Sequence, residues 1–201
     1  MKLSASAHTS QRWRIHEFTH DFRVEDVWAL PTPGGPGDFP RLVRLIASRD
    51  PARESGSAKA RAARALWLIR VKAGRLLGLD RADSGLGGRV PSLRDRLPAE
   101  LRDAPATDFA VREFTSLYQL DNEWAAEIAN QTMHGVMHLG WVPDGAGGYR
   151  GQMAVLVKPN GALGAGYMAA IRPFRELIVY PAMLRWLARS WRASGSATTP
   201  V

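Results

Sequence analysis

Cysteine is absent from this chain of 201 residues, and its absence excludes several chemistries at once. Disulfide bridges, thiolate nucleophiles, zinc sites with thiolate ligands and iron–sulfur clusters all depend on that residue. The chain also lacks a run of about 18 apolar residues, the length that a membrane-spanning helix needs. The first ten residues are polar, without the apolar stretch of a signal peptide, so we expect a cytoplasmic protein.

Lysine is scarce as well, because 23 of the 27 basic residues are Arg and 4 are Lys. The net charge of +8 would suit a nucleic acid or an anionic membrane, but the basic residues are scattered and form no run of five. In the most basic stretch, 59–75, the basic residues have the spacing of a solvated helix face. The amphipathic stretch 174–192 has the pattern of a helix that packs on a core. We therefore do not expect nucleic acid or membrane as partners.

What the chain does contain fits one folded domain, with 45% hydrophobic and 23% charged residues. A chain of this length buries enough surface to form a core without cross-links. We predict a flexible N-terminal tail over 1–11, a single domain over 12–192 and a disordered C-terminal tail over 193–201.

The hydrophobic pattern of the first half predicts one strand followed by helices. Trp13 and Ile15 alternate with Arg14 and His16, which predicts a strand over 12–19. Helices are predicted over 23–30, over 39–48 behind Asp38, over 58–77 and over 93–102 behind Ser92.

The second half changes to alternating patterns, which predict strands over 114–120, 123–128, 132–142 and 149–158. An Ala-rich helix is the alternative for 123–128. A helical segment over 163–191 follows, and Pro173 and Pro181 should kink it. Strands and helices do not alternate as in a doubly wound nucleotide fold. The sequence therefore predicts an α+β protein, with helices packed on one antiparallel sheet.

Four segments of the chain resemble an uncharacterised bacterial family of the START and Bet v 1-like (SRPBCC) superfamily. They are HDFRVEDVWAL (20–30), EWAAEIANQTMHGVMHLGWV (123–142), MAVLVKPNGALGAGYMAAI (153–171) and PFRELIVYPAMLR (173–185). The resemblance implies a helix-grip fold, in which a curved antiparallel sheet wraps around a long C-terminal helix, with additional helices inserted after the first strand.

The same resemblance implies a ligand cavity between the sheet and the C-terminal helix. Members of the superfamily bind lipids, hormones and polyketides, and some are cyclases or hydrolases. Related domains occur fused behind a short-chain-dehydrogenase-like module, so a separate dehydrogenase-like protein is a further partner that the resemblance suggests.

Two Glu and two His make the strongest candidate for chemistry. A two-residue turn at 130–131 would place Glu127 opposite His134 and Glu123 opposite His138 on one face of a hairpin. A carboxylate fixes the tautomer of a neighbouring imidazole and stabilises its charged form, as a general base requires. The alternative is a ladder of charged pairs that faces solvent.

A metal or phosphate site has weaker support. His134 and His138 have the spacing of a helical zinc site, but Gly135 stands where a metalloprotease needs Glu. Gly161, Gly164 and Gly166 do not have the spacing of a dinucleotide-binding loop. We therefore expect neither a metal nor another cofactor.

Our preferred hypothesis is that the protein binds a small apolar or amphipathic molecule between the sheet and the C-terminal helix. The residues expected to contact it are His138, Asn130, Arg150, Met153, Val155, Tyr167, Met168, Ile171 and Arg175.

The second hypothesis is an enzyme, a cofactor-independent cyclase, isomerase or hydrolase that uses the same cavity. Its base would be His134, oriented by Glu127, with Arg175 stabilising charge. The third is a binding module that acts on nucleic acid or an anionic membrane through its basic surface.

Overall fold

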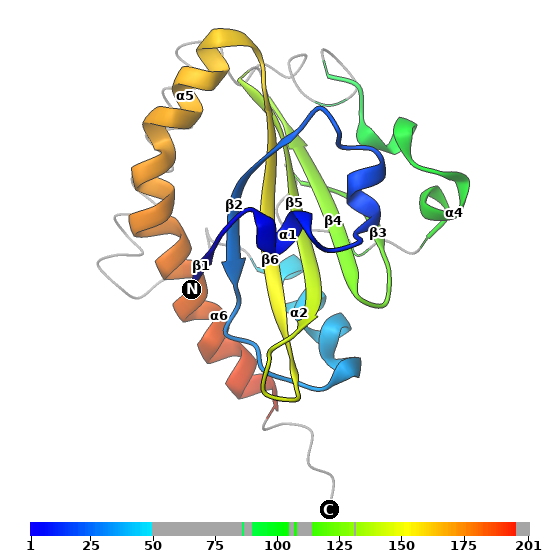
Figure 1. Ribbon diagram of the computed structural model, residues 1–201, viewed down its shortest axis with the longest axis vertical. Coiled ribbons are helices and arrows are strands. Elements are labelled where there is room, and N and C mark those ends of the chain that lie inside the picture. The colour runs from blue at the N-terminus through cyan, green and yellow to red at the C-terminus, as the bar shows by residue number, and fades with distance from the viewer. Residues whose placement is uncertain (50–85, 87–89, 105–106, 108–113, 131, 196–201) are drawn as a thin grey trace, which may run out of the picture.

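A curved antiparallel sheet of six strands forms the centre of the computed structural model, which describes residues 1–49, 86, 90–104, 107, 114–130 and 132–195 (Figure 1). The strands are β1 (Lys2–Leu3), β2 (Arg23–Ala29), β3 (Thr115–Gln119), β4 (Glu123–Ala129), β5 (Met133–Pro143) and β6 (Tyr149–Pro159). The helices are α1 (Ser6–Thr9), α2 (Phe39–Ala47), α4 (Ala99–Arg102), α5 (Gly161–Phe174) and α6 (Tyr180–Gly195), with 3-10 turns at Arg14–Glu17, Pro36–Asp38 and Leu93–Arg96 and a π turn at Arg175–Val179.

The strand order is β1-β2-β6-β5-β4-β3, and every neighbouring pair is antiparallel. The first long strand, β2, therefore lies beside β6, the last strand of the chain, while β3 to β6 follow one another through hairpins. The predicted α+β class and the four strands of the second half are confirmed. Within the described residues, no helix is long and apolar enough to cross a membrane.

Each face of the sheet has its own core, because alternate side chains of a strand point to opposite faces. The N-terminal face, as we call it, is covered by residues 1–22 and by residues 92–104. Its buried side chains include Trp13, Ile15, Leu93, Leu97, Val136 and Leu156. The opposite face, here the helix face, is covered by α2 and α6, and its buried side chains include Trp28, Leu42, Leu139, Met153, Leu187 and Trp191. In Figure 1 the N-terminal segment crosses in front of the sheet, and α5 and α6 run down one side.

The N-terminal segment differs from its prediction. The strand expected over 12–19 is wrong, since this stretch contains a 3-10 turn at Arg14–Glu17. Trp13 and Ile15 are both buried because one side of the segment lies on the sheet, and this contact produces the same alternation as a strand. The flexible tail expected over 1–11 is also wrong: β1 pairs with β2, and His8 on α1 is completely buried.

The short helix expected over 23–30 is wrong as well, because this stretch is β2, paired with β6. A bulge between Val24 and Asp26 shifts its register by one residue. The bulge interrupts the apolar–polar alternation, and this interruption made the sequence resemble an amphipathic helix. The buried partner strand then overrides the local preference.

The other predicted helices are confirmed where the structure describes them. Residues 39–47 form α2, although the Asp38 carboxylate accepts the Gly35 N–H instead of capping the helix. Ser92 caps a 3-10 turn by accepting the Arg94 N–H, and Pro98 separates this turn from α4. The helix predicted over 58–77 lies outside the described residues.

The C-terminal helical segment begins two residues earlier than predicted and changes geometry in the middle. Pro173 lies inside α5, and the π turn Arg175–Val179 then joins α5 to α6. Proline removes one helical hydrogen bond, and a π turn is one way in which a helix accommodates such a defect. The helix continues to Gly195, beyond the predicted boundary at 192.

Candidate functional site

Glu127 and His134 form a buried pair on the N-terminal face. His134 Nε2 lies 2.8 Å from Glu127 Oε2, with side chains 5% and 0% exposed. Glu127 also accepts the backbone N–H of Leu93 at 3.0 Å and the hydroxyl of Ser92. The carboxylate therefore joins a histidine of β5 to the segment that begins at Ser92.

Glu123 and His138 form a second pair on the same face, with Nε2 of His138 3.0 Å from Oε2 of Glu123. Glu123 accepts the backbone N–H of Arg14 at 2.9 Å. On the other side of the His138 ring, Nδ1 lies 3.2 Å from Nε2 of His8. With Glu123 ionised, His138 donates to the carboxylate and accepts from His8, which fixes the tautomer of both rings.

Burial dominates the electrostatics of this second cluster. Burial and, to a smaller extent, the charge of His16 lower the pKa of His138 to about 3. Burial also lowers the pKa of His8, with His138 and His16 as smaller causes. Burial raises the pKa of Glu123 to about 7, opposed by the hydrogen bond from the Arg14 backbone and by the Arg14 charge. The two histidines are consequently neutral at pH 7.

The expected hairpin register is shifted by two residues. The hairpin closes between Asn130 and Met133, so Glu127 lies opposite Val136 and Ala129 lies opposite His134. A shift of two keeps every side chain on its face. The two Glu–His pairs therefore form between diagonal neighbours, and the alternative of a solvent-facing ladder is wrong because all four side chains are buried.

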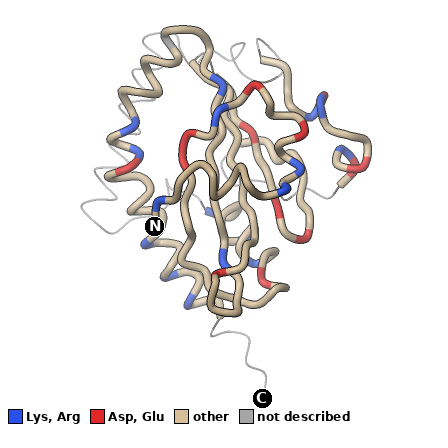
Figure 2. Tube along the Cα trace, in the orientation of Figure 1, with Lys and Arg blue, Asp and Glu red and all other residues tan. Residues whose placement is uncertain are grey.

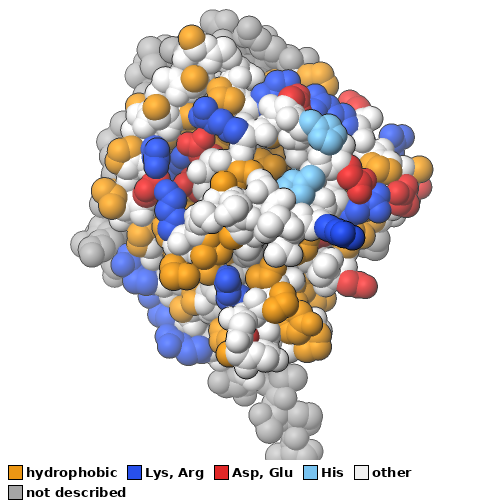
Figure 3. Space-filling model, viewed as in Figure 1, with side chains coloured by type: hydrophobic (Ala, Val, Ile, Leu, Met, Phe, Trp, Pro, Cys, Tyr) orange, Lys and Arg blue, Asp and Glu red, His pale blue; other side chains and the backbone are white. Residues whose placement is uncertain are grey.

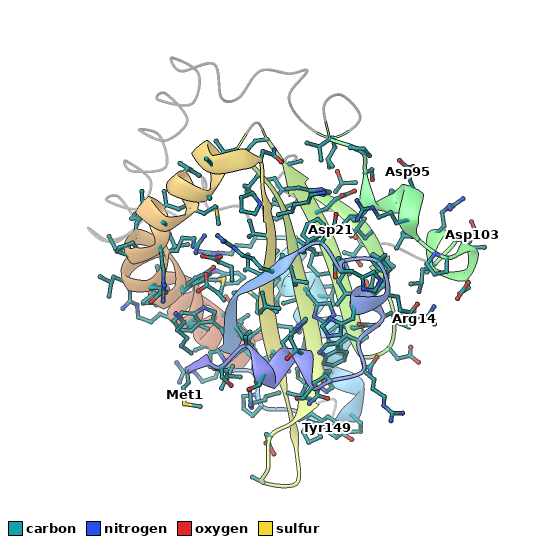
Figure 4. All side chains as sticks on the ribbon, turned by 45° about the horizontal axis from the view of Figure 1, so that its top comes forward. Met1, Arg14, Asp21, Asp95, Asp103 and Tyr149 are labelled. Carbon is teal, nitrogen blue, oxygen red and sulfur yellow. The ribbon has the colours of Figure 1, made fainter. Side chains whose placement is uncertain are left out.

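The two carboxylates connect the sheet to the two segments that cover it. Glu123 bonds to the first covering segment at Arg14, and Glu127 bonds to the second at Ser92 and Leu93. Figure 4 labels Arg14 and Asp95, one on each segment, and both lie over the same side of the sheet. Trp13 completes the contact, since a Cβ atom at Gly140 would lie 2.5 Å from Cζ2 of its ring.

The helix face contains the apolar residues that were expected to line a ligand site. Met153 is buried, and Val155 is half-buried beside its partner Met137, which is also half-buried. From α5, Met168 is buried and Ile171 is half-buried. The expectation that the Glu–His pairs share one cavity with these residues is wrong, because the pairs lie on the opposite face of the sheet.

Two contacts hold α5 at its beginning. Asn160 donates its backbone N–H to Thr132 O at 2.8 Å, and Gly164 packs so closely on the same carbonyl that a Cβ atom would overlap it. The end of α5 is held by ion pairs of Arg175 and by a hydrogen bond from Tyr180. The helix is thus fixed to the sheet at both ends.

Arg175 lies in a cluster of charges between β2 and the π turn. Its Nη2 atom is 3.0 Å from Glu25 Oε1 and 3.2 Å from Asp26 Oδ2, and Tyr180 Oη donates to Asp26 Oδ2 at 2.9 Å. Burial, followed by the charge of Asp26, raises the pKa of Tyr180 well above its usual range, so its hydroxyl stays a donor.

The remaining predicted contact residues lie apart from one another. Asn130 caps the β4–β5 turn by accepting the N–H groups of Thr132 and Met133. Arg150 is half-buried beside Val142, on the N-terminal face, and Tyr167 is half-buried on α5. His138 belongs to the buried cluster around Glu123.

Sequence reasoning missed three functional candidates: His8, Glu25 and Asp26. The sequence predicts a flexible tail around His8 and a short helix around the two acidic residues. A signal was present for the acidic pair, because it interrupts the apolar run from Val24 to Leu30. Nothing local marks His8, whose partners are far away in the sequence.

The basic residues of the described part of the chain do not gather in one place. Figure 2 shows them interspersed with acidic residues, and Figure 3 shows both signs spread over the N-terminal face. On α6, Arg185, Arg189 and Arg192 are exposed. Among the described residues, no group of three His, Asp or Glu side chains is arranged to hold a metal ion.

Comparison with known proteins gives one match. A family model described as "Protein of unknown function (DUF2867)" matches residues 18–182. No curated protein and no solved structure gives a significant match.

Proposed function

The chain belongs to the DUF2867 family, which has no assigned function, and from its geometry we propose that it binds a small apolar or amphipathic molecule between the helix face and α5. The site would be lined by Met137 and Val155 from the sheet and by Met168 and Ile171 from the helix.

The supporting observation is the partial exposure of Met137 and Val155. These residues face each other on the two central strands, and they point to the same face as Asp26, which pairs with Arg175 just after α5. Central side chains under a closely packed helix lose nearly all their exposure, because protein interiors are packed as densely as organic crystals. The neighbouring pair Val136 and Leu156, on the other face, is only 1% and 2% exposed.

The composition of α5 points the same way. Its sequence is almost entirely apolar, yet Ile171 and Phe174 are half-buried, and Ala169 and Ala170 are exposed. An apolar helix that packs loosely on an apolar sheet leaves room for an apolar ligand. The helix-grip architecture that we expect from the resemblance has its ligand in this place, and the curved sheet and long C-terminal helix are compatible with it.

The first experiment is mass spectrometry of small molecules extracted from the purified protein after denaturation. A stoichiometric ligand would support the proposal and give the chemical class. Binding can also be measured directly with N-phenyl-1-naphthylamine, an apolar probe whose fluorescence rises when it leaves water.

A variant tests where the probe binds. We expect Val155→Trp to fill the space and weaken probe binding by at least about tenfold, while the melting temperature stays close to that of the parent. Leu177→Trp is the matched control, because Leu177 is 75% exposed and the same indole is then added outside the site. Unchanged probe binding by Val155→Trp would contradict the proposal.

A second candidate is proton transfer by His134 and Glu127, which the 2.8 Å contact favours. Such an enzyme would use the N-terminal face and not the site under α5. Turnover would be seen as a metabolite of a cell extract that the parent consumes and His134→Asn does not. The cytoplasmic location and the dehydrogenase-like partner stay predictions from the sequence.

A further inference from the structure

Two backbone irregularities lie against each other where α5 ends. On the sheet, the bulge between Val24 and Asp26 places Glu25 and Asp26 towards the helix. On the helix, the π turn Arg175–Val179 begins at the residue that pairs with both carboxylates. Bulges and π turns are frequent at functional sites, because each redirects a side chain that regular structure would point elsewhere.

The polar atoms of this cluster are only partly used. Asp26 Oδ2 has two partners, but Asp26 Oδ1 is buried without a hydrogen bond, and the ammonium of Lys2 is 3.7 Å from it. Arg175 Nε is also buried without a hydrogen-bond partner among the described residues, and Nη1 of the same residue lies 3.8 Å from the sulfur of Met168. The Asp26 side chain is 1% exposed and that of Arg175 is 12% exposed. A spare acceptor and a spare donor thus lie in two residues joined by an ion pair.

This cluster adjoins the apolar residues of the proposed site. Asp26 lies directly opposite Val155 in the β2–β6 pairing, so both side chains point to the helix face. Arg175 contacts Met168 through Nη1. An amphipathic molecule whose chain lies along Met137 and Val155 can therefore bring its polar end to Asp26 and Arg175.

The charges of this cluster determine which kind of polar group on a ligand fits beside it. The guanidinium of Arg175 is already shared by two carboxylates, so an anionic group would meet Glu25 and Asp26 as repelling neighbours. An ammonium group would meet Arg175 itself and the nearby Lys2. A hydroxyl group is neutral and is both donor and acceptor, so it matches one spare acceptor and one spare donor.

Building on the function proposed above, we propose that the site takes a neutral amphiphile with a hydroxyl group at its polar end. The hydroxyl donates to Asp26 Oδ1 and accepts from Arg175 Nε, and the apolar remainder lies between the helix face and α5.

The test is displacement of N-phenyl-1-naphthylamine from the full chain by four probes of similar length. They are 1-octanol, octanoate, octylammonium and 1-methoxyheptane, an ether isomeric with octanol that accepts a hydrogen bond but donates none. We expect octanol to displace the probe at a concentration about tenfold lower than each of the others, which is the value of one well-placed hydrogen bond.

Variants then show which protein atoms cause the preference for octanol. Asp26→Asn replaces the acceptor with an amide, and octanol should lose its advantage over the ether. Arg175→Lys removes the Nε donor, so octanol and the ether should weaken together while probe binding persists. Tyr180→Phe is the matched control, because it changes the other oxygen of Asp26 and should leave the preference for octanol intact.

The outcomes separate the two proposals. If the naphthylamine probe does not bind, the proposed function fails. If the probe binds but octanol is no better than the ether, or if octanoate or octylammonium is preferred, the function stands and the hydroxyl assignment is overturned. If Asp26→Asn does not fold, the comparison of Arg175→Lys with Tyr180→Phe still decides, since equal displacement by octanol in both contradicts a role for Nε.

Discussion

Strands β5 and β6 contain two adjacent cross-strand pairs whose side chains point to opposite faces of the sheet and differ in burial. Val136 and Leu156 point to the N-terminal face and are almost completely buried, whereas Met137 and Val155 point to the helix face and are half-buried. The two pairs belong to the same strands and have similar side chains. The difference therefore comes from what covers each face.

The cover of the N-terminal face is held by directional contacts. Buried carboxylates and imidazoles need hydrogen-bond partners, and here the partners are backbone N–H groups of the covering segments. Each such bond fixes the distance between cover and sheet. On the helix face, the polar contacts of Arg175 and Tyr180 with β2 lie just beyond the end of α5, and apolar contact alone fixes no distance. The comparison teaches that the two faces of one sheet can be covered to different degrees. Polar contacts hold the N-terminal cover against the middle of the sheet, whereas those described for α5 lie near the two ends of that helix.

Removing a buried carboxylate that bonds to a covering segment should have the largest effect on stability. Glu127→Ala leaves His134, Ser92 and the Leu93 N–H without their common partner, and we expect a loss of about 3–5 kcal/mol in the free energy of unfolding. Urea unfolding followed by circular dichroism measures it. The control is Glu100→Ala, an exposed carboxylate paired with Arg14, which should change stability little. Equal effects of the two variants would show that the hydrogen bonds of Glu127 do not hold the covering segment on the sheet.

Lowering the pH should reduce the stability of the folded protein through the titratable groups buried on the same face. The unfolded chain protonates His8 and His138 near pH 6.5, whereas the folded protein keeps both neutral because their pKa values are lowered by burial. Glu123 acts in the opposite sense: with its pKa raised from 4.5 to about 7, the folded protein holds a proton there that the unfolded chain lacks. Two histidines outweigh one carboxyl group, so the unfolded state binds about one proton more between roughly pH 6 and 5, and stability falls there by about 1.4 kcal/mol per pH unit.

This pH dependence is measured by urea unfolding at several pH values. His8→Phe keeps an aromatic ring under the cover and removes one titrating group, so its profile should be flatter. His20→Gln is the control, since His20 is exposed and its replacement should leave the profile unchanged. The other titratable and charged groups that face this cluster are His16, Tyr118 and Arg14. A parent profile without slope between roughly pH 6 and 5 would contradict the argument.

The packing of the two faces can be compared by making the same substitution on each. The stability loss expected on the helix face is the smallest of the effects predicted here. Val136→Ala removes two methyl groups from a close-packed layer and should cost about 2–3 kcal/mol. Val155→Ala removes the same groups from a half-buried position and should cost about 1 kcal/mol or less. Thermal and urea unfolding of both variants give the comparison. A larger loss for Val155→Ala would mean that the helix face is as tightly packed as the other.

The sequence predicted the second half of the chain better than the first. Strands β3 to β6 follow one another in the chain and pair as hairpins, so local alternation and turn residues were enough to place them. The Glu–His pairs were found for the same reason, and an error of two in the register kept them on one face. The first half depends on distant partners: β2 is a strand because β6 lies beside it, and His8 is buried because His138 lies beneath it.

By itself, the sequence determined the α+β class, the four consecutive strands, the long C-terminal helix and the side of the hairpin that carries Glu123, Glu127, His134 and His138. These features depend on periodicity, which is a property of neighbouring residues. Only the tertiary structure decided that the Glu–His pairs lie on the face opposite α5 and that Asp26 meets Arg175. A pattern of alternation shows that side chains share a face, but which element covers that face depends on contacts between residues far apart in the chain.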